Sequence, residues 1–254
     1  MSQPIPSKPE YANWVSSRLV YVPAALAFLL GGLAAFTLWL LLPALFCFAC
    51  ASYFAYAQWK LSERGGDIQR KIQALVPQHL RWKGTGAALD IGCGNGSLAI
   101  AIAKAYPLAH VTGIDAWGRS WGYSKAACDR NASIEGVTKQ VTFQQASAVQ
   151  LPFPEGTFDV VVSNLVFHEV RGVPDKKLLL KEALRVLKKG GTFVLQDLFL
   201  WKRVYGDVGD LLGAIRDWGV ASVEFAPTNG MAFIPKALKL PFMVGTMGII
   251  HGSK

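Results

Sequence analysis

Three glycines at alternate positions interrupt an apolar stretch in "ALDIGCGNGSLAI", residues 88–100. Residues 87–91 are typical of a buried strand, and from Ser97 onward the apolar residues have the spacing of one helix face. Gly92, Gly94 and Gly96 therefore lie at a strand-to-helix turn. Glycine has no Cβ and adopts positive φ, and a helix begins with unpaired N–H groups. The turn thus predicts a site where a ligand approaches the backbone closely.

An acidic residue, Asp115, ends the second predicted strand and follows Gly92 by 23 positions in the sequence. In a doubly wound sheet, a carboxylate at this position accepts hydrogen bonds from the hydroxyls of a ribose bound over the glycine turn. The pair predicts an adenosine-type cofactor. The alternative is that Asp115 only caps the next helix.

A second acidic residue, Asp90, comes directly before the glycines and gives the order D-x-G-x-G-x-G. A nicotinamide fingerprint has the order G-x-G-x-x-G and places a pyrophosphate there, which an acid would repel, whereas an ammonium group would suit it. With "LPFPEGTFDVVVSNLVFHEV" (151–170) and "ALRVLKKGGTFVLQDLF" (183–199), the chain resembles the class I S-adenosylmethionine-dependent methyltransferases, in their small-molecule, methyltransferase type 11-like branch. The resemblance covers about residues 80–254 and implies S-adenosylmethionine as the cofactor.

The resemblance also implies roles for individual residues at the cofactor. Asp90 and the backbone of Gly92, Gly94 and Gly96 would hold the methionine part, and Asp115 would hold the ribose. Asn164, at the end of the fourth strand, would lie beside the methionine end.

The adenine end of the implied cofactor site departs from the family pattern. Ala116 and Trp117 would flank the adenine, but Ser147 stands where an acidic residue usually ends the third strand. Ser147 or the backbone of Ala148 would then meet the adenine amino group.

Two titratable residues, His168 and Glu169, follow the fourth strand in "SNLVFHEV". Methyl transfer from a sulfonium depends mainly on positioning, and a base is needed only when the nucleophile must lose a proton. His168, with an ordinary pKa of about 6.5, is the candidate base, with Glu169 orienting it or taking that role. The alternative is a structural histidine that bonds a loop or lines the acceptor pocket.

Strands and helices must alternate to bring these residues to one edge. The expected strands are 87–91, 111–115, 141–145, 158–165 and 192–197, and the expected helices are 97–105, 124–134, 176–187 and 208–218. Such alternation predicts a doubly wound, mostly parallel α/β sheet with ligands at the carboxyl ends of its strands. The resemblance implies seven strands, the last two forming an antiparallel hairpin with arms at 221–225 and 245–251.

A long uncharged segment precedes this domain: residues 19–59 contain no Asp, Glu, Lys, Arg or His over 41 positions. A bilayer core needs about 20 helical residues, so we expect a membrane hairpin broken at Pro43, with spans 20–41 and 44–57. The pattern allows either one or two membrane crossings, and a cleaved signal peptide is the competing interpretation. Residues 58–83 carry six basic and two acidic side chains, a net charge of +4, which favours a cytoplasmic catalytic domain.

The net charge of +9 on the whole chain does not require a nucleic acid, because the basic residues are spread without an aromatic-basic array. A membrane surface is the simpler partner. The cysteines, Cys47, Cys50, Cys93 and Cys128, have neither the spacing of a disulfide framework nor that of a metal site, and we expect no metal.

The sequence thus predicts a tail (1–18), a membrane segment (19–59), a basic linker and helix (60–83) and a methyltransferase domain (84–254). We expect a membrane-anchored enzyme that methylates a small-molecule or lipid-like acceptor. The alternatives are a nucleotide-dependent oxidoreductase and a non-catalytic S-adenosylmethionine-binding scaffold on the membrane.

Overall fold

The computed structural model describes residues 8–118 and 122–254. The chain forms two compact units, residues 13–72 and residues 1–12 with 73–254, and each is described by itself. Of the predicted tail, residues 1–7 lie outside the described residues.

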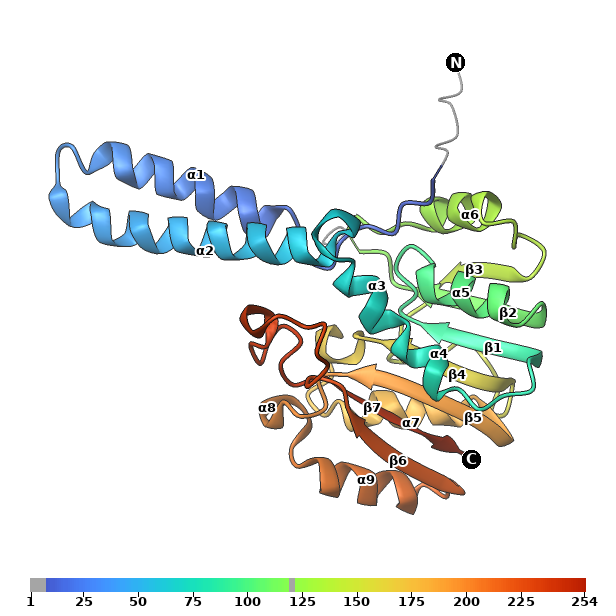
Figure 1. The fold of residues 1–254 in the computed structure, drawn as a ribbon. Coiled ribbons are helices and arrows are strands. Elements are labelled where there is room, and N and C mark those ends of the chain that lie inside the picture. The colour runs from blue at the N-terminus through green and yellow to red at the C-terminus, as the bar shows by residue number, and fades with distance from the viewer. Residues whose placement is uncertain (1–7, 119–121) are drawn as a thin grey trace. The chain divides into compact units, whose positions relative to one another are not determined.

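The larger unit is built on a seven-stranded sheet with the strand order β3-β2-β1-β4-β5-β7-β6 (Figure 1). The strands are β1 Thr85–Ile91, β2 Leu108–Asp115, β3 Val141–Gln145, β4 Phe158–Asn164, β5 Leu187–Asp197, β6 Ser222–Pro227 and β7 Gly248–Ser253. The first five are parallel, and β7 runs antiparallel to both β5 and β6. This confirms the expected doubly wound sheet and its terminal antiparallel hairpin.

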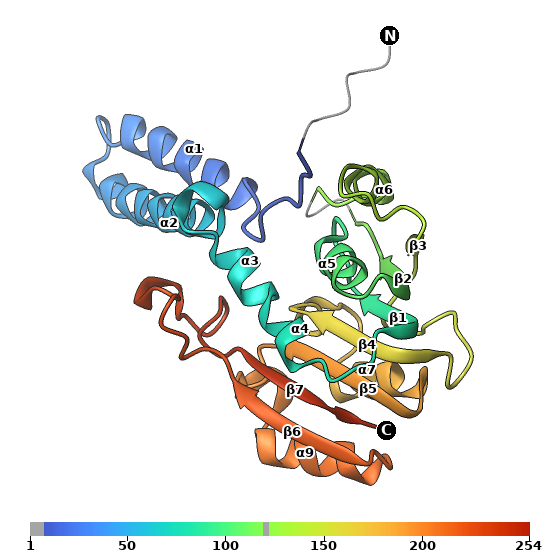
Figure 2. The same cartoon turned by 45° about the vertical axis from the view of Figure 1, so that its right-hand side comes forward.

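Helices cover both faces of this sheet (Figure 2). On one face lie α4 Leu75–His79, α5 Ser97–Ala105 and α6 Lys125–Ile134; on the other lie α7 Lys177–Arg185, α8 Lys202–Tyr205 and α9 Val208–Asp217. Two short 3₁₀ turns, η3 Phe167–Glu169 and η4 Lys236–Leu238, complete the unit. The predicted helices 97–105 and 208–218 agree with α5 and α9 to within one residue.

Alternate residues of each central strand enter opposite cores. Ala88 and Val160 pack in the core under α5, whereas Leu89 and Val161 pack in the core under α7. A parallel strand buried on both faces reads as a continuous apolar run, and this is why "VVV" at 160–162 indicates a central strand.

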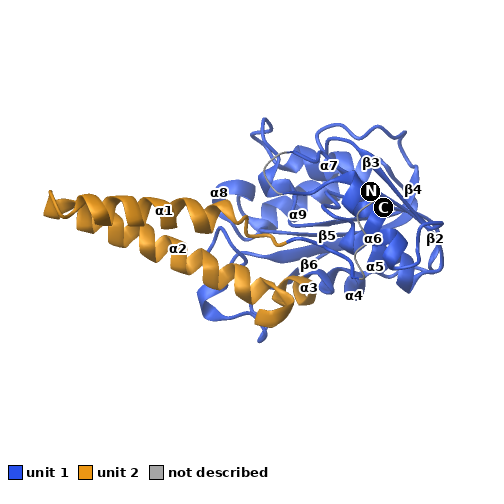
Figure 3. Ribbon diagram, turned by 90° about the horizontal axis from the view of Figure 1, so that it is seen from above, with its two compact units in different colours: residues 1–12, 73–254 blue, residues 13–72 orange. Residues whose placement is uncertain are grey.

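The smaller unit holds two antiparallel helices, α1 Arg18–Leu33 and α2 Leu41–Leu61, joined through the 3₁₀ turn η1 Leu38–Leu40 (Figure 3). After them come η2 Glu63–Gly65 and α3 Ile68–Gln73. The predicted break at Pro43 is wrong, because Pro43 lies in the first turn of α2. The missing N–H of a proline costs nothing there, since the first N–H groups of a helix have no intrahelical partner.

Large apolar side chains on this pair of helices and on the connection between them are exposed. Phe28, Phe36 and Trp39 have 82%, 88% and 80% of their surface accessible. Among the described residues one helical segment, Leu38–Leu61, is long and apolar enough to cross a membrane, with a mean hydropathy of 1.9; α1 is shorter. The second helix is therefore the longer one, contrary to the sequence expectation, because α1 ends at Leu33 and α2 continues beyond residue 57 to Leu61.

Candidate functional site at the carboxyl edge of the sheet

The glycine turn follows β1 and leads into α5 as predicted. Gly92, Gly94 and Gly96 have φ values of 73°, 57° and 85°, which L-residues rarely adopt. A Cβ on Gly92 would lie 2.2 Å from Val166 Cγ2, and one on Gly96 would lie 2.8 Å from Phe143 Cζ. At Gly92 and Gly96, a larger residue would therefore clash with a neighbouring side chain as well as strain the backbone.

Asp115, the last residue of β2, is bound to this turn. Its Oδ2 accepts a hydrogen bond from the Gly94 N–H at 2.9 Å, and its Oδ1 accepts one from the Trp117 N–H at 2.8 Å. Burial raises the pKa of Asp115, against the opposing effect of these N–H groups. A carboxylate has about four lone-pair sites, so beside these N–H groups and that of Ala116 the Asp115 carboxylate can still accept a hydrogen bond from a ligand.

Trp117 closes one side of the turn. Its Nε1 donates a hydrogen bond to the Gly94 carbonyl at 2.8 Å, and its own φ is 42°. A tryptophan in this region is strained, and such strain gathers at functional sites. Ala116, beside it, is exposed, and its carbonyl accepts a hydrogen bond from Gln145 Nε2 at 2.8 Å.

Asp90 lies beneath the turn, with 1% of its surface exposed. Its Oδ2 accepts a hydrogen bond from the Ala99 N–H at 3.0 Å, in the first turn of α5. Burial raises the pKa of Asp90 to about 7, the Ala99 N–H opposes this shift and the nearby Asp115 adds to it. Asp90 therefore holds the helix start, and its carboxyl titrates near neutral pH.

Asn164, the last residue of β4, carries an unsatisfied acceptor. The strand register pairs Ser163 with Ile91, which places Asn164 beside the glycine turn. Its Oδ1 is one of three buried side-chain atoms without a hydrogen-bond partner in residues 8–118 and 122–254. A buried acceptor left unpaired costs about 1–3 kcal/mol, which suggests a donor supplied by a ligand.

The two residues after β3 that were expected at the adenine, Ser147 and Ala148, make contacts within the protein. Ser147 is exposed, and its Oγ accepts a hydrogen bond from the Val149 N–H at 3.2 Å, so the side chain shapes its own loop. Ala148 is half-buried and packs against the core under α7.

One aromatic residue at the turn is missed by the sequence reasoning. The Tyr123 ring lies 3.7 Å from where a Cβ on Gly94 would be. Burial raises the pKa of Tyr123, and the carboxylates of Glu169 and Asp115 raise it further. Tyr123 thus stands between the cofactor turn and the segment after β4; nothing in its local sequence signals this.

His168 and Glu169 lie in η3, as expected, but the main partner of His168 is Asp197 at the end of β5. His168 Nδ1 is 2.6 Å from Asp197 Oδ1, whereas His168 Nε2 is 3.8 Å from Glu169 Oε1. Asp197 is fully buried and also accepts hydrogen bonds from the N–H groups of Phe167 and Leu198, at 2.8 and 2.7 Å. In the sequence, the feature that points to Asp197 is its place as a polar residue at the end of a predicted central strand.

Charge couples the two residues of this pair. Burial lowers the pKa of His168, but the Asp197 carboxylate, its hydrogen bond and Glu169 outweigh that effect, so the pKa lies above its ordinary value. Burial likewise raises the pKa of Asp197, yet His168 and the N–H donors bring it below its usual range. Asp197 thus stays ionised and fixes the His168 ring, which leaves Nε2 free to exchange a proton.

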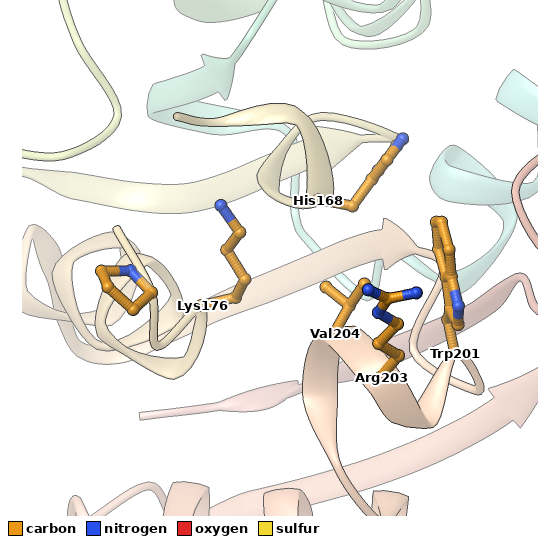
Figure 4. A pocket seen from close by; sticks show the side chains of 6 residues that line it. His168, Lys176, Trp201, Arg203 and Val204 are labelled. Carbon is orange, nitrogen blue, oxygen red and sulfur yellow. The ribbon is translucent and has the colours of Figure 1, made fainter. Parts of the chain in front are cut away.

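A cavity of about 400 Å³ opens beside this pair (Figure 4). Its lining residues come from the segments after β4 and β5 and from the start of α7: His168, Pro174, Lys176, Trp201, Arg203 and Val204. Its size lies in the range of small-molecule sites.

Comparison with known proteins finds similarity to methyltransferases. Residues 89–195 match the family described as "Methyltransferase domain". The chain is 39% identical over 112 residues to 27-O-demethylrifamycin SV methyltransferase of Amycolatopsis mediterranei (strain S699), matching 44% of this chain and 38% of that protein. It is 33% identical over 128 residues to a ubiquinone/menaquinone biosynthesis C-methyltransferase of Syntrophotalea carbinolica, matching 50% of each.

A solved structure shares the fold. Geranyl diphosphate C-methyltransferase from Streptomyces coelicolor A3(2), in complex with Mg²⁺, geranyl diphosphate and S-adenosyl-L-homocysteine, superimposes with a TM-score of 0.56 at 15% identity, covering 74% of this chain and 79% of that one. The chain spans half or less of the length of the two relatives named above. The matched region is an S-adenosylmethionine-dependent methyltransferase domain, and S-adenosylmethionine is its cofactor.

Proposed function

We propose that this methyltransferase is held at a membrane by residues 13–72 and transfers a methyl group to a small-molecule acceptor bound beside His168. The observation that carries the proposal is the convergence of the glycine turn, Asp115 and the unpaired Asn164 Oδ1 at one edge of the sheet. Asp115 and Asn164 are acceptors for the hydroxyl and ammonium groups of an amino-acid-bearing nucleoside, and the glycines leave space beside them.

The residues present fit such a cofactor. The free lone pairs of Asp115 would accept hydrogen bonds from ribose hydroxyls, and Asn164 Oδ1 would accept one from the ammonium group. Asp90 would supply negative charge to the same ammonium. Backbone N–H groups of Gly92 and Cys93 already bond the Ile114 carbonyl, so the ligand would face the remaining edge of the turn.

The adenine would lie between Ala116, Trp117 and the loop after β3. Because the Ser147 hydroxyl bonds within its own loop, the backbone of Ala148 is the better donor or acceptor for the adenine amino group. Tyr123 would add an aromatic wall near Gly94.

S-adenosylmethionine supplies a methyl group that its sulfonium has already activated, so this chain has to position the acceptor and manage its proton. His168 lines the cavity, and its Nε2 would take the proton of a hydroxyl or amine nucleophile. Asp197 is a positioning residue: it holds Nδ1 and stabilises the imidazolium that forms. Glu169, 44% exposed, would exchange the proton with solvent.

The exposed apolar helices support the membrane half of the proposal. A core helix of a soluble domain would be mostly buried, yet only 11% of the segment around α2 is buried. The 21 residues of α2 span about 32 Å, close to the hydrocarbon thickness of about 30 Å, whereas the 16 residues of α1 span about 24 Å. Both ends of the pair would stay on the cytoplasmic side with their basic residues.

The relatives support the acceptor class. One is named for a demethylated rifamycin and the other for ubiquinone and menaquinone biosynthesis, and we propose a quinone-like or other lipophilic ring compound here. A membrane anchor would hold the domain where such acceptors partition.

The experiment is a transfer assay with full-length protein in neutral detergent. S-adenosylmethionine labelled in the methyl group is incubated with a panel of hydroxylated ring compounds, and extracted products are counted. Label in an acceptor supports the proposal. A protein that binds the cofactor but labels no acceptor would be the non-catalytic scaffold, and one that binds only a nicotinamide cofactor would be the oxidoreductase.

A further inference from the structure

The cavity beside His168 has an uneven charge. Two of its six lining side chains, Lys176 and Arg203, are cationic, and none is a carboxylate. The others are His168, whose negative partner Asp197 is buried behind it, and the uncharged Pro174, Trp201 and Val204. The cavity therefore presents positive charge on an otherwise apolar and aromatic wall.

The Arg203 guanidinium has no hydrogen bond or ion pair with any residue in 8–118 or 122–254. Its neighbour Lys202 does have one, since it faces Asp207 at 3.7 Å. Lys176 Nζ donates a hydrogen bond to the Val170 carbonyl, which fixes the ammonium at the cavity and leaves two of its N–H donors free. Glu169 lies on the His168 side, 3.8 Å from its Nε2, and does not line the cavity.

The residues that line the cavity come from three segments of the chain. His168 comes from the segment after β4, Lys176 from the start of α7, and Trp201, Arg203 and Val204 from α8 and the residue before it (Figure 4). An acceptor bound in this cavity would have Trp201, His168 and the two cationic side chains as neighbours. Arg and Lys bind carboxylate and phosphate oxygens through charge-assisted hydrogen bonds.

We propose that the methyl acceptor carries an anionic oxygen group, a carboxylate or a phosphate, which Lys176 and Arg203 bind while Trp201 packs on its ring. This rests on the proposed function and narrows its acceptor to hydroxylated ring acids. A lipophilic tail on such an acid would extend outside the cavity, whose volume of about 400 Å³ suits only a compact head group.

The test uses full-length protein in neutral detergent, saturated with S-adenosylhomocysteine, and three probes of one shape: 4-hydroxybenzoate, 4-hydroxyphenyl phosphate and the neutral 4-hydroxybenzamide. Affinities are measured by ligand-observed NMR. We expect one or both anions to bind about tenfold more tightly than the amide, and their ranking identifies the group. The preference should shrink between about 0.05 M and about 0.5 M salt, since exposed charges are screened.

Arg203→Gln and Lys176→Gln should each weaken anion binding about tenfold and leave the amide unchanged. Lys202→Gln is the matched control, because its side chain is 82% exposed, is paired with Asp207 and does not line the cavity. Equal affinity for acid and amide, no anion binding, or variants that bind as wild type would overturn the proposal. Binding of S-adenosylhomocysteine is measured separately. If the wild-type protein does not bind it, the proposed function itself is overturned.

Discussion

His168 Nδ1 lies 2.6 Å from Asp197 Oδ1, although 29 positions separate the two residues in the sequence. The pairing follows from the sheet, because β4 and β5 are parallel neighbours and Asn164 lies opposite Gln196. The residues just beyond both strand ends therefore meet at one edge. Hydrogen bonds from the Val166 and Phe167 N–H groups to Asp197 Oδ2 fix the segment that carries His168.

Removing the base should slow turnover without affecting the cofactor. His168→Gln is expected to lower kcat about 100-fold or more with an acceptor that must lose a proton, because general-base catalysis contributes that much. Cofactor affinity by calorimetry should stay within about twofold, since His168 lies at the acceptor cavity.

The matched control is His110→Gln, on the exposed side of β2. Unchanged turnover in His168→Gln between about pH 6 and about pH 9 would leave positioning as the whole mechanism.

The pH dependence of turnover should report the His168–Asp197 pair. A base must be neutral to act, and the pKa of His168 is raised, so activity should fall on the acid side with a midpoint above about 6.5. In Asp197→Asn the raising charge is lost while burial remains, so the midpoint should move to lower pH as kcat drops. An NMR titration of the His168 ring checks the assignment, and a midpoint unmoved by Asp197→Asn would contradict it.

Cofactor affinity should itself depend on pH through Asp90. Its pKa is raised to about 7, so the carboxyl becomes neutral as pH falls below that value and would lose its attraction for the ammonium group. We expect affinity to weaken up to about tenfold per pH unit between about pH 7 and about pH 5.5.

Asp90→Asn should flatten this dependence while its carbonyl oxygen still accepts the Ala99 N–H. The measurement is calorimetry across the pH series. A wild-type affinity constant across that range would show that Asp90 serves only to begin α5.

Membrane attachment should resist extraction. Alkaline carbonate washing of membranes is expected to leave the full-length protein in the pellet, because exposed side chains such as Phe28, Phe36 and Trp39 would be in lipid. Phe48→Lys, at a 62% exposed site near the middle of the apolar segment Leu38–Leu61, should release a larger fraction, since a lysine at a helix centre in the bilayer costs about 3 kcal/mol. Complete release of wild type would show peripheral attachment.

The binding of cofactor by a soluble form should depend on where the chain is cut. Removing residues 1–59 would discard Glu10, whose N–H bonds Asn131 Oδ1 and whose carbonyl accepts from Asn95 Nδ2 beside the glycine turn. Replacing residues 13–72 by a flexible linker keeps residues 8–12 with the catalytic unit. We expect this form to bind cofactor without detergent and a form lacking residues 1–59 to bind it more weakly.

Local signals predict much of this fold. The glycine turn, Asp115 and Asn164 stand where strand ends and turn chemistry place them, and "VVV" at 160–162 marks a strand buried on both faces. The helix break predicted at Pro43 is wrong because a proline also occurs in the first turn of a helix, where it does not interrupt the hydrogen bonding.

Long-range partners could not be predicted. Asp197 and Tyr123 reach the site through sheet register and loop packing, and their local sequence does not identify the residues that they contact there. Such contacts depend on strand order, which alternation of elements leaves open.

Calorimetric titration of S-adenosylmethionine into full-length wild type and Asp115→Ala tests the central claim most directly. The variant should lose about 2 kcal/mol or more of binding free energy, about 30-fold in Kd, because ribose hydroxyls lose a charged acceptor. Asp129→Ala is the control, since the Asp129 side chain is 53% exposed and pairs with Lys125 on the surface of α6. Equal affinities for wild type and Asp115→Ala, or no binding by wild type, would contradict the account.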